Sequence, residues 1–370
     1  MKLISRLICG LVINVQGSPS RFMDQLDREL AVYPVSSGKP DILIRFGQQF
    51  KDDKLADNPG IHSEYEDGFA ANFGNALVRW RWGYSRILVD WFSPIPEKSW
   101  SRKALSMQFS HPYQEIGQIF HELVLIPTLQ LFYSHHFLLL HGSALAVIRE
   151  KKAVVFGGTG GAGKTSLELS LVGKKYSFMA DDISFIDVNG TVWANFSWPK
   201  IYGYNTLGND VVKSRVLTGR SAVDRLFWRL RMGLSGPDRV RRRVQPEIFY
   251  SGNVTQKADF SEYYILFRDG SPALAVRPLN TSTAVRMSLE VMASEYTILY
   301  RHLNWHKYNR LSLQQEPFIT VGDIFDHWQV AGRRIFENIK CYMVHIPFDF
   351  SVSELKSVFP EMLIRHREST

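Results

Sequence analysis

The chain has 370 residues, of which 45% are hydrophobic and 22% charged, a composition that excludes both a disordered chain and a disulfide-stapled miniprotein. Its length suggests two or three domains. The formal net charge is +8, and residues 213–243 alone carry ten basic and two acidic residues, which accounts for the whole excess. The two cysteines, Cys9 and Cys341, stand near opposite ends of the chain without the spacing of a zinc site.

Residues 1–110 predict a small α/β domain. The apolar run 7–15 follows two basic residues, but it is short and no small-residue cleavage site follows it, so it predicts a first strand and not a signal peptide. Ser18 and Pro19 predict the start of a helix, because Pro is favoured at the first helical position. The expected elements are a strand over 11–15, a helix with the apolar face Phe22, Leu26 and Leu30, a strand over 41–46, a loop over 52–68, and a hairpin of 76–81 with 85–92.

Residues 111–300 predict a larger second domain, and residues 301–370 predict a C-terminal segment that packs on it. Apolar spacing over 112–132 predicts a helix, whose polar residues leave it short of the roughly 18 uninterrupted apolar residues that cross a bilayer. We therefore expect a cytoplasmic protein. The later elements expected are strands over 137–143, 153–156, 176–180, 264–268, 274–277 and 341–346, and helices over 166–172, over 282–300 and from 353.

The stretch 158–165 is the most informative motif. It matches G-x-x-x-x-G-K-[ST] at each fixed position and lies between a predicted strand and a predicted helix. Glycines let successive N–H groups turn towards phosphate oxygens, and the helix N-terminus adds partial positive charge. Lys164 is expected to contact the β- and γ-phosphates and Thr165 to hold Mg²⁺; a glycine-rich turn without a ligand is the alternative. The expected nucleotide-binding residues are Gly158, Thr159, Gly160, Gly161, Ala162, Gly163, Lys164, Thr165 and Ser166.

An acidic pair, Asp181 and Asp182, ends the strand predicted over 176–180. A helix of about two and a half turns separates this strand from the glycine-rich loop, so the pair is expected to return close to Lys164. One carboxylate can bind the metal, and the other can accept the proton of an attacking hydroxyl. The alternative is a solvated turn at a strand end.

These motifs together resemble a known family. The run Leu140-His141-Gly142, the loop 158–165 and the run Met179-Ala180-Asp181-Asp182 occur in the order and close spacing of the HPr kinase/phosphorylase superfamily, which is related to phosphoenolpyruvate carboxykinase. The resemblance covers 137–187 and extends weakly to 264–300. It implies an α/β fold with a P-loop kinase core of this type, here with an additional N-terminal α/β domain.

The resemblance also implies roles for individual residues. Asp181 would deprotonate the acceptor hydroxyl, Asp182 would help to bind the metal, and His141 would lie near the transferred phosphate. The chain lacks the Glu-x-Arg-Gly-like signature that follows the acidic pair in the family, which puts HPr itself and phosphorolysis of phosphoserine in doubt. Divergent members that phosphorylate peptides or free amino acids are the nearer comparison. Lys200 or Arg220 could supply a further cation, and the sequence does not choose between them.

The basic segment 213–243 contains an amphipathic helix. Val223, Leu226, Phe227, Leu230 and Leu234 share its apolar face, and Arg225 and Arg229 lie on the other side. The segment could dock an acidic protein or peptide, rest on an anionic lipid surface, or pack its apolar face on the protein's own core. Its place after the acidic pair also suits a lid over an active site. A role in nucleic-acid binding is not expected.

The sequence thus predicts an ATP- and Mg²⁺-dependent kinase with Lys164, Asp181 and His141 as catalytic residues and with Thr165 and Asp182 at the metal. The acceptor would be a serine of a peptide or protein, or a small serine-like molecule. The alternative is a nucleotide-binding regulatory or scaffold module whose basic segment docks an acidic partner. Members of the resembled family often assemble, which makes a homo-oligomer a further expectation. His302 and His306, four residues apart, lack the Glu of a zinc-protease helix, so no metal site is expected there.

Overall fold

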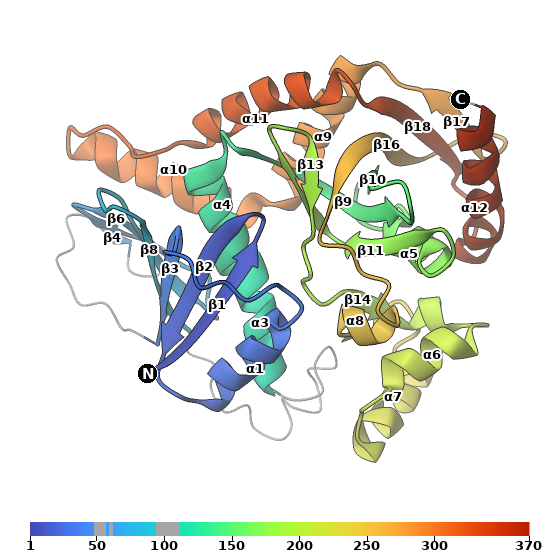
Figure 1. Ribbon diagram of the computed structural model, residues 1–370, viewed down its shortest axis with the longest axis horizontal. Coiled ribbons are helices and arrows are strands. Elements are labelled where there is room, and N and C mark those ends of the chain that lie inside the picture. Colours follow the sequence, from blue (N-terminus) through green and yellow to red (C-terminus); the bar gives the residue numbers. More distant parts are fainter. Residues whose placement is uncertain (48–56, 59–61, 94–111, 370) are drawn as a thin grey trace. The chain divides into compact units, whose positions relative to one another are not determined.

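The computed structural model describes residues 1–47, 57–58, 62–93 and 112–369. It is a mixed α/β protein with several sheets, and the chain divides into two compact units (Figure 1). The first unit comprises Met1–Ser134, Lys200–Gln245 and Thr297–Ile324, and the second comprises His135–Pro199, Pro246–Tyr296 and Phe325–Thr370.

The division differs from the expected boundaries near 110 and 300. The helical stretch after residue 112 and the whole basic segment 213–243 group with the N-terminal strands, and most of the C-terminal segment groups with the glycine-rich loop. Buried polar contacts explain the first difference. Arg243 forms an ion pair of 2.5 Å with Glu29 in which both side chains are fully buried, and Trp80 Nε1 donates a hydrogen bond of 3.0 Å to Thr128 Oγ1.

The first unit is built on an eight-stranded sheet with the order β1-β2-β3-β8-β7-β6-β5-β4. β2, β3 and β8 are parallel neighbours, and the other pairings are antiparallel. The predicted hairpin is confirmed, whereas the loop predicted over 52–68 is wrong at 57–58 and 62–65, which form strands. Residues 52–56 and 59–61 lie outside the described part of the chain. The strands are β1 (Lys2–Ile8), β2 (Leu11–Gly17), β3 (Ile42–Phe46), β4 (Asp57–Asn58), β5 (His62–Tyr65), β6 (Gly68–Asn72), β7 (Leu77–Arg81) and β8 (Ile87–Phe92).

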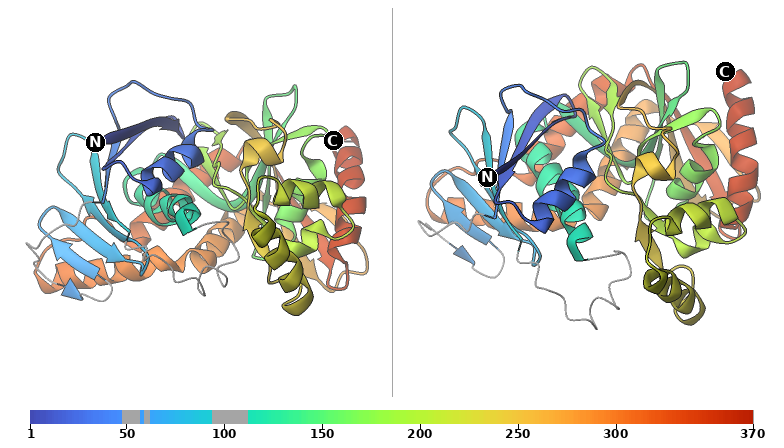
Figure 2. Two further views of the ribbon diagram at one scale, coloured as in Figure 1. Left: turned by 90° about the horizontal axis from the view of Figure 1, so that it is seen from below. Right: turned by 60° about the horizontal axis from the view of Figure 1, so that its bottom comes forward.

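Helices of the first unit come from three parts of the chain. Ser20, and not Ser18, caps α1: its side chain accepts a hydrogen bond from the Met23 N–H. α1 and α3 lie side by side in each view (Figure 2). The helices are α1 (Arg21–Leu30), η1 (Pro112–Gln114), α3 (Glu115–Ile119), η2 (Phe120–Leu125), α4 (Ile126–Tyr133), η3 (Gly203–Thr206), α6 (Asp210–Leu217), α7 (Ala222–Leu234) and α10 (Thr297–Ser312), with the two-stranded sheet β14 (Lys200–Tyr202) and β15 (Arg241–Arg243).

The second unit is built on a sheet that closes on itself. β9 pairs antiparallel with β10, β11 and β12, and β12 continues through β13 to β16, which returns to pair in parallel with β10. β16 also pairs in parallel with β18, and β17 forms the edge. The strands are β9 (Phe137–Val147), β10 (Lys152–Gly157), β11 (Tyr176–Ala180), β12 (Ile183–Asp187), β13 (Thr191–Trp193), β16 (Lys257–Asp269), β17 (Ala275–Pro278) and β18 (Lys340–Pro347).

Helices cover this second sheet and complete its core. The apolar side chains of α5 pack with those of α12 against β10, β16 and β18. The single helix predicted over 282–300 is instead two helices, since α9 ends at Glu295. The helices are α5 (Lys164–Leu171), α8 (Pro246–Phe249), α9 (Thr281–Glu295), α11 (Val321–Phe336) and α12 (Val352–Ser369), of which α11 begins in the first unit. Among the described residues, no helix is long and apolar enough to cross a membrane.

The buried ion pair gives a first prediction. Arg243→Met should lower the free energy of unfolding by about 3–5 kcal/mol, because it removes the buried cation that faces the buried Glu29 carboxylate. Urea titration followed by tryptophan fluorescence measures this change. The double variant Glu29→Leu/Arg243→Met should recover part of the loss, and Arg239→Met, at an exposed arginine of the same segment, should change stability by less than about 0.5 kcal/mol. Equal effects of Arg243→Met and Arg239→Met would contradict the assignment.

Candidate functional site

The glycine-rich loop 158–165 joins the carboxyl end of β10 to the N-terminus of α5. Gly158, Gly161 and Gly163 have φ of 131°, 78° and 115°, in the region that only glycine adopts without strain. A Cβ atom on Gly158 would also lie 2.6 Å from the carbonyl oxygen of Leu266 on the neighbouring β16. The glycines of the motif are therefore required by the backbone path and by the close approach of the next strand.

Lys164 begins α5 and is buried inside the loop. Its Nζ donates hydrogen bonds to the carbonyl oxygens of Gly158 (2.7 Å) and Thr159 (3.0 Å). Burial lowers the pKa of the ammonium, and the nearby carboxylates of Asp182, Asp181 and Glu295 act in the opposite direction. Both of these hydrogen-bond partners are neutral carbonyl oxygens. An anion bound by the loop could therefore form an ion pair with the ammonium.

The acidic pair lies beside the start of α5, as the sequence predicts. Asp181 and Asp182 form the turn between β11 and β12. The Thr165 hydroxyl donates a hydrogen bond of 2.7 Å to Asp181 Oδ1, and the Ser143 hydroxyl donates one of 2.6 Å to the Asp181 carbonyl oxygen. The structure thus pairs Thr165 with Asp181, whereas the sequence grouped Thr165 with Asp182.

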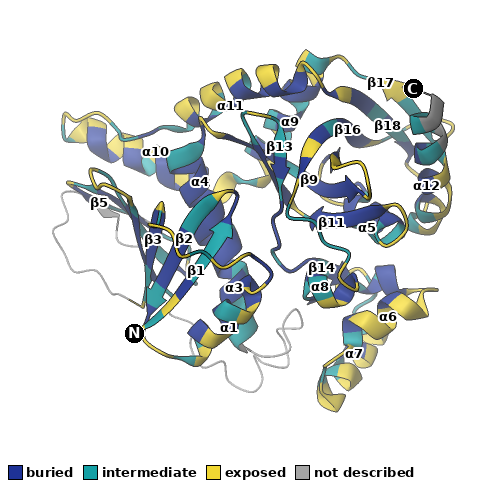
Figure 3. Cartoon of the chain, viewed as in Figure 1, coloured by how far each residue is buried: buried dark blue, intermediate teal, exposed yellow. Residues whose placement is uncertain are grey.

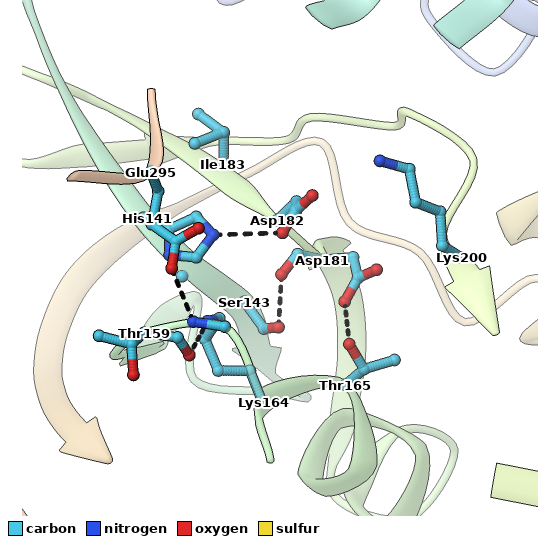
Figure 4. Close-up of polar contacts among 12 residues, drawn as sticks. His141, Ser143, Thr159, Lys164, Thr165, Asp181, Asp182, Ile183, Lys200 and Glu295 are labelled. Atoms are coloured by element: carbon cyan, nitrogen blue, oxygen red, sulfur yellow. Dashed lines mark hydrogen bonds and ion pairs between the residues drawn. The ribbon is translucent and has the colours of Figure 1, made fainter. Parts of the chain in front are cut away.

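His141, on β9, lies between the loop and the second carboxylate. Its Nδ1 is 3.0 Å from the Gly158 carbonyl oxygen, and its Nε2 is 3.4 Å from Asp182 Oδ1. A carbonyl oxygen only accepts, so Nδ1 carries a proton in this contact. The Asp182 side chain is 59% exposed. Figure 4 shows that the predicted residues from β9, the loop and the β11–β12 turn point towards one another.

Two acidic residues at the site were missed by sequence reasoning. Glu168 follows Lys164 by one helical turn and is fully buried, and its carboxylate accepts a hydrogen bond from the Tyr250 hydroxyl. Burial above all, and then the neighbouring Asp181, raise its pKa well above the ordinary value. A charged residue on the buried face of a predicted helix is the one signal that could have identified it.

Glu295 is the second residue that was missed. It is the last residue of α9, and its Oε1 accepts a hydrogen bond of 2.8 Å from the backbone N–H of Gly160 (Figure 4). One of the loop's N–H groups is therefore already hydrogen-bonded to a carboxylate. The residue lies 135 positions from the loop along the chain, and no local pattern connects the two.

The two cations proposed from the sequence are engaged within the first unit. Lys200 Nζ lies 2.5 Å from Glu122 Oε1. Arg220 forms an ion pair of 3.1 Å with Asp224 and donates to the Arg243 carbonyl oxygen. Both side chains are therefore paired with carboxylates of their own unit. Ser166, which the sequence grouped with the loop, is buried in the first turn of α5.

His306 belongs to a buried cluster with His62 and Glu64. The three offer ligand atoms within 4.8 Å of one another. However, His306 Nε2 accepts a hydrogen bond of 2.9 Å from the Phe318 N–H, so its Nδ1 must carry the proton that it shares with Glu64. A metal at Nδ1 would have to displace that proton while Nε2 is already an acceptor, so the hydrogen bonds suit a neutral structural network that links α10 to β5.

Comparison with known proteins adds no relative: no family model matches the chain, and a search of curated proteins found no match. The residues themselves therefore carry the argument for function.

The Glu295 contact gives a second prediction. Glu295→Ala should tighten the binding of pyrophosphate and ATP about fivefold, because the carboxylate competes with a phosphate oxygen for the Gly160 N–H and repels the incoming charge. Glu295→Gln should have a smaller effect, since the amide oxygen still accepts but carries no charge. Calorimetric titration measures both. Glu290→Ala, an exposed residue on the same helix, is the matched control, and weaker binding by Glu295→Ala would show that the residue assists binding instead.

Proposed function

We propose that the protein is an ATP- and Mg²⁺-dependent phosphotransferase that transfers the γ-phosphoryl group to a hydroxyl, either a serine of a peptide or protein or a small serine-like molecule. One observation carries the proposal. Lys164 and Thr165, at the start of α5, lie with Asp181, Asp182 and His141 around one glycine-rich loop. These are the residue types that phosphoryl transfer requires, and three separate stretches of the chain supply them.

The loop fits a nucleotide triphosphate by its chemistry. Its N–H groups and the N-terminus of α5 favour an anion, as the carboxylate of Glu295 on the Gly160 N–H illustrates. The ammonium of Lys164 bonds only carbonyl oxygens, which a phosphate oxygen can replace as its partner. A P-loop kinase core of the HPr kinase/phosphoenolpyruvate carboxykinase type belongs to the same proposal, which rests on the motifs and their spacing.

Mg²⁺ suits the oxygen donors beside the loop, which are the Thr165 hydroxyl and the carboxylates of the acidic pair. When bound, the ion neutralises charge on the phosphates. Because Thr165 already contacts Asp181, we assign Asp181 to the metal side of the site. This assignment exchanges the roles of the two carboxylates that the sequence resemblance implied.

Asp182 is then the base. Its carboxylate is more than half exposed, so an acceptor hydroxyl can reach it, and it can accept the hydroxyl proton as the oxygen attacks phosphorus. His141 Nε2 lies 3.4 Å from Asp182 Oδ1 and attracts this carboxylate towards the loop when the ring carries a second proton. The contact of Nδ1 with the Gly158 carbonyl fixes the orientation of the ring.

The direct test is transfer of label from γ-labelled ATP in the presence of Mg²⁺, with cell extract and a panel of small hydroxyl compounds as acceptors. A labelled acceptor that disappears with Lys164→Ala would support the proposal and identify the substrate class. Tight ATP binding with no labelled acceptor under any condition would contradict the kinase and favour a nucleotide-binding regulatory module.

The roles of the two carboxylates give a third prediction. Asp182→Asn should lower kcat at least about a thousandfold with ATP binding unchanged, because it removes the base. Asp181→Asn should raise the Mg²⁺ concentration required for half-maximal binding of ATP, because it removes an ionised oxygen beside Thr165. Single-turnover kinetics and calorimetry at varied Mg²⁺ separate the two effects. The reverse pattern would restore the assignment of Asp181 as base.

A further inference from the structure

The helix α7 leaves its apolar side chains in solvent. Of its 13 residues, Trp228 is the one that is buried. Val223, Leu226, Leu230 and Leu234 are 58%, 55%, 49% and 85% exposed, and their spacing places them on one face, called here the leucine stripe. Figure 3 shows α7 largely in the colour of exposed residues. Exposed apolar patches of this kind mark interaction sites in folded proteins.

The other face of α7 explains why the helix is ordered without burying the leucine stripe. The guanidinium of Arg242 lies over the ring of Trp228, with 5.3 Å between its Cζ atom and the ring centroid. Asp224 is paired with Arg242 at 2.6 Å and with Arg220 at 3.1 Å, and all three side chains are largely buried. The segment thus buries Arg220 and Arg242 and leaves the leucine stripe exposed. The alternative in which the apolar face packs on the protein's own core is not what the structure has at these positions.

Exposed arginines border the leucine stripe. Arg225 and Arg229 are exposed; at 100° per residue Arg229 lies next to the edge of the stripe that Leu226 marks, and Arg225 lies farther round the helix, towards the side opposite the stripe. Arg231 lies along the other edge and is partly exposed. An apolar band with an arginine beside each edge favours a partner that is apolar at its centre and anionic around it.

We propose that α7 binds the surface of an anionic membrane, with the leucine stripe at the boundary of headgroups and acyl chains and with Arg229 and Arg231, one beside each edge, on lipid phosphates and carboxylates. A single helix with basic residues on both edges fits a planar interface, where long arginine stems lie on apolar surface while their heads stay in water. An acidic helical partner would instead require a groove to receive it. The helix α7 belongs to the first unit, whereas the residues of the nucleotide site belong to the second.

Co-sedimentation of the full chain with vesicles tests the proposal. The protein should bind vesicles of phosphatidylcholine with phosphatidylserine and bind those of phosphatidylcholine alone much more weakly. Arg229→Gln should weaken binding about fivefold, and Leu226→Gln/Leu230→Gln should weaken it on the order of tenfold for each leucine. Both variants should retain the unfolding temperature of the parent, because the side chains are exposed.

Matched controls change the same residue types elsewhere. Arg333→Gln/Arg334→Gln removes two exposed arginines of α11, and Leu311→Gln/Val330→Gln removes two apolar side chains that are 52% and 72% exposed. Neither should affect vesicle binding. The proposal is overturned if anionic vesicles are not bound, or if the controls and the α7 variants behave alike. Binding of polyglutamate without vesicle binding would identify an acidic protein as the partner, and self-association lost in the leucine variant would identify a second copy of the chain.

Discussion

The buried ammonium of Lys164 is the constraint on which the second unit depends. Removing a cation from water is costly, and the loop offsets that cost with the carbonyl oxygens of Gly158 and Thr159, which only a tightly curled backbone can present together. The curl requires positive φ at the glycines, and the nearby carboxylates favour the charged form of the ammonium. One arrangement therefore accommodates the loop conformation, the burial of Lys164 and its positive charge, and it favours an anion beside the loop. The Glu295 carboxylate, from α9, partly fills that position.

Local signals predicted much of the second unit. The strands over 176–180 and 341–346 and the helix after Lys164 appear where apolar periodicity and the motif placed them, because each is specified by residues within one element. The same holds for the clustering of His141, Lys164 and the acidic pair, since the short helix α5 returns the chain to the same sheet, where β10 and β11 both pair with β9, the strand that carries His141. The pairing of Thr165 with Asp181 and not Asp182 was not predictable, because it depends on side-chain directions in a turn.

Contacts between distant segments account for what the sequence did not predict. Glu295 reaches the loop across 135 residues, and Glu29 meets Arg243 across 214. Neither contact can be recognised from the local sequence, because a charged residue gives the same local pattern whether its side chain is buried with a partner or exposed. For the same reason the sequence of the basic segment leaves open whether its leucines face the protein's own core, an acidic partner or a lipid surface. Asp224 and Trp228, on the face opposite the leucines, determine which side is buried.

Glu295 also connects the loop to the path of the chain. It closes α9, whose last turn contains no basic residue, so its carboxylate stands at the negative end of the helix dipole. The Gly160 N–H compensates for this unfavourable position. One residue later the chain passes from the second unit to the first, between Tyr296 and Thr297. An anion that takes the Gly160 N–H therefore removes the contact that stabilises the end of α9, at the point where the chain leaves the unit that holds the loop.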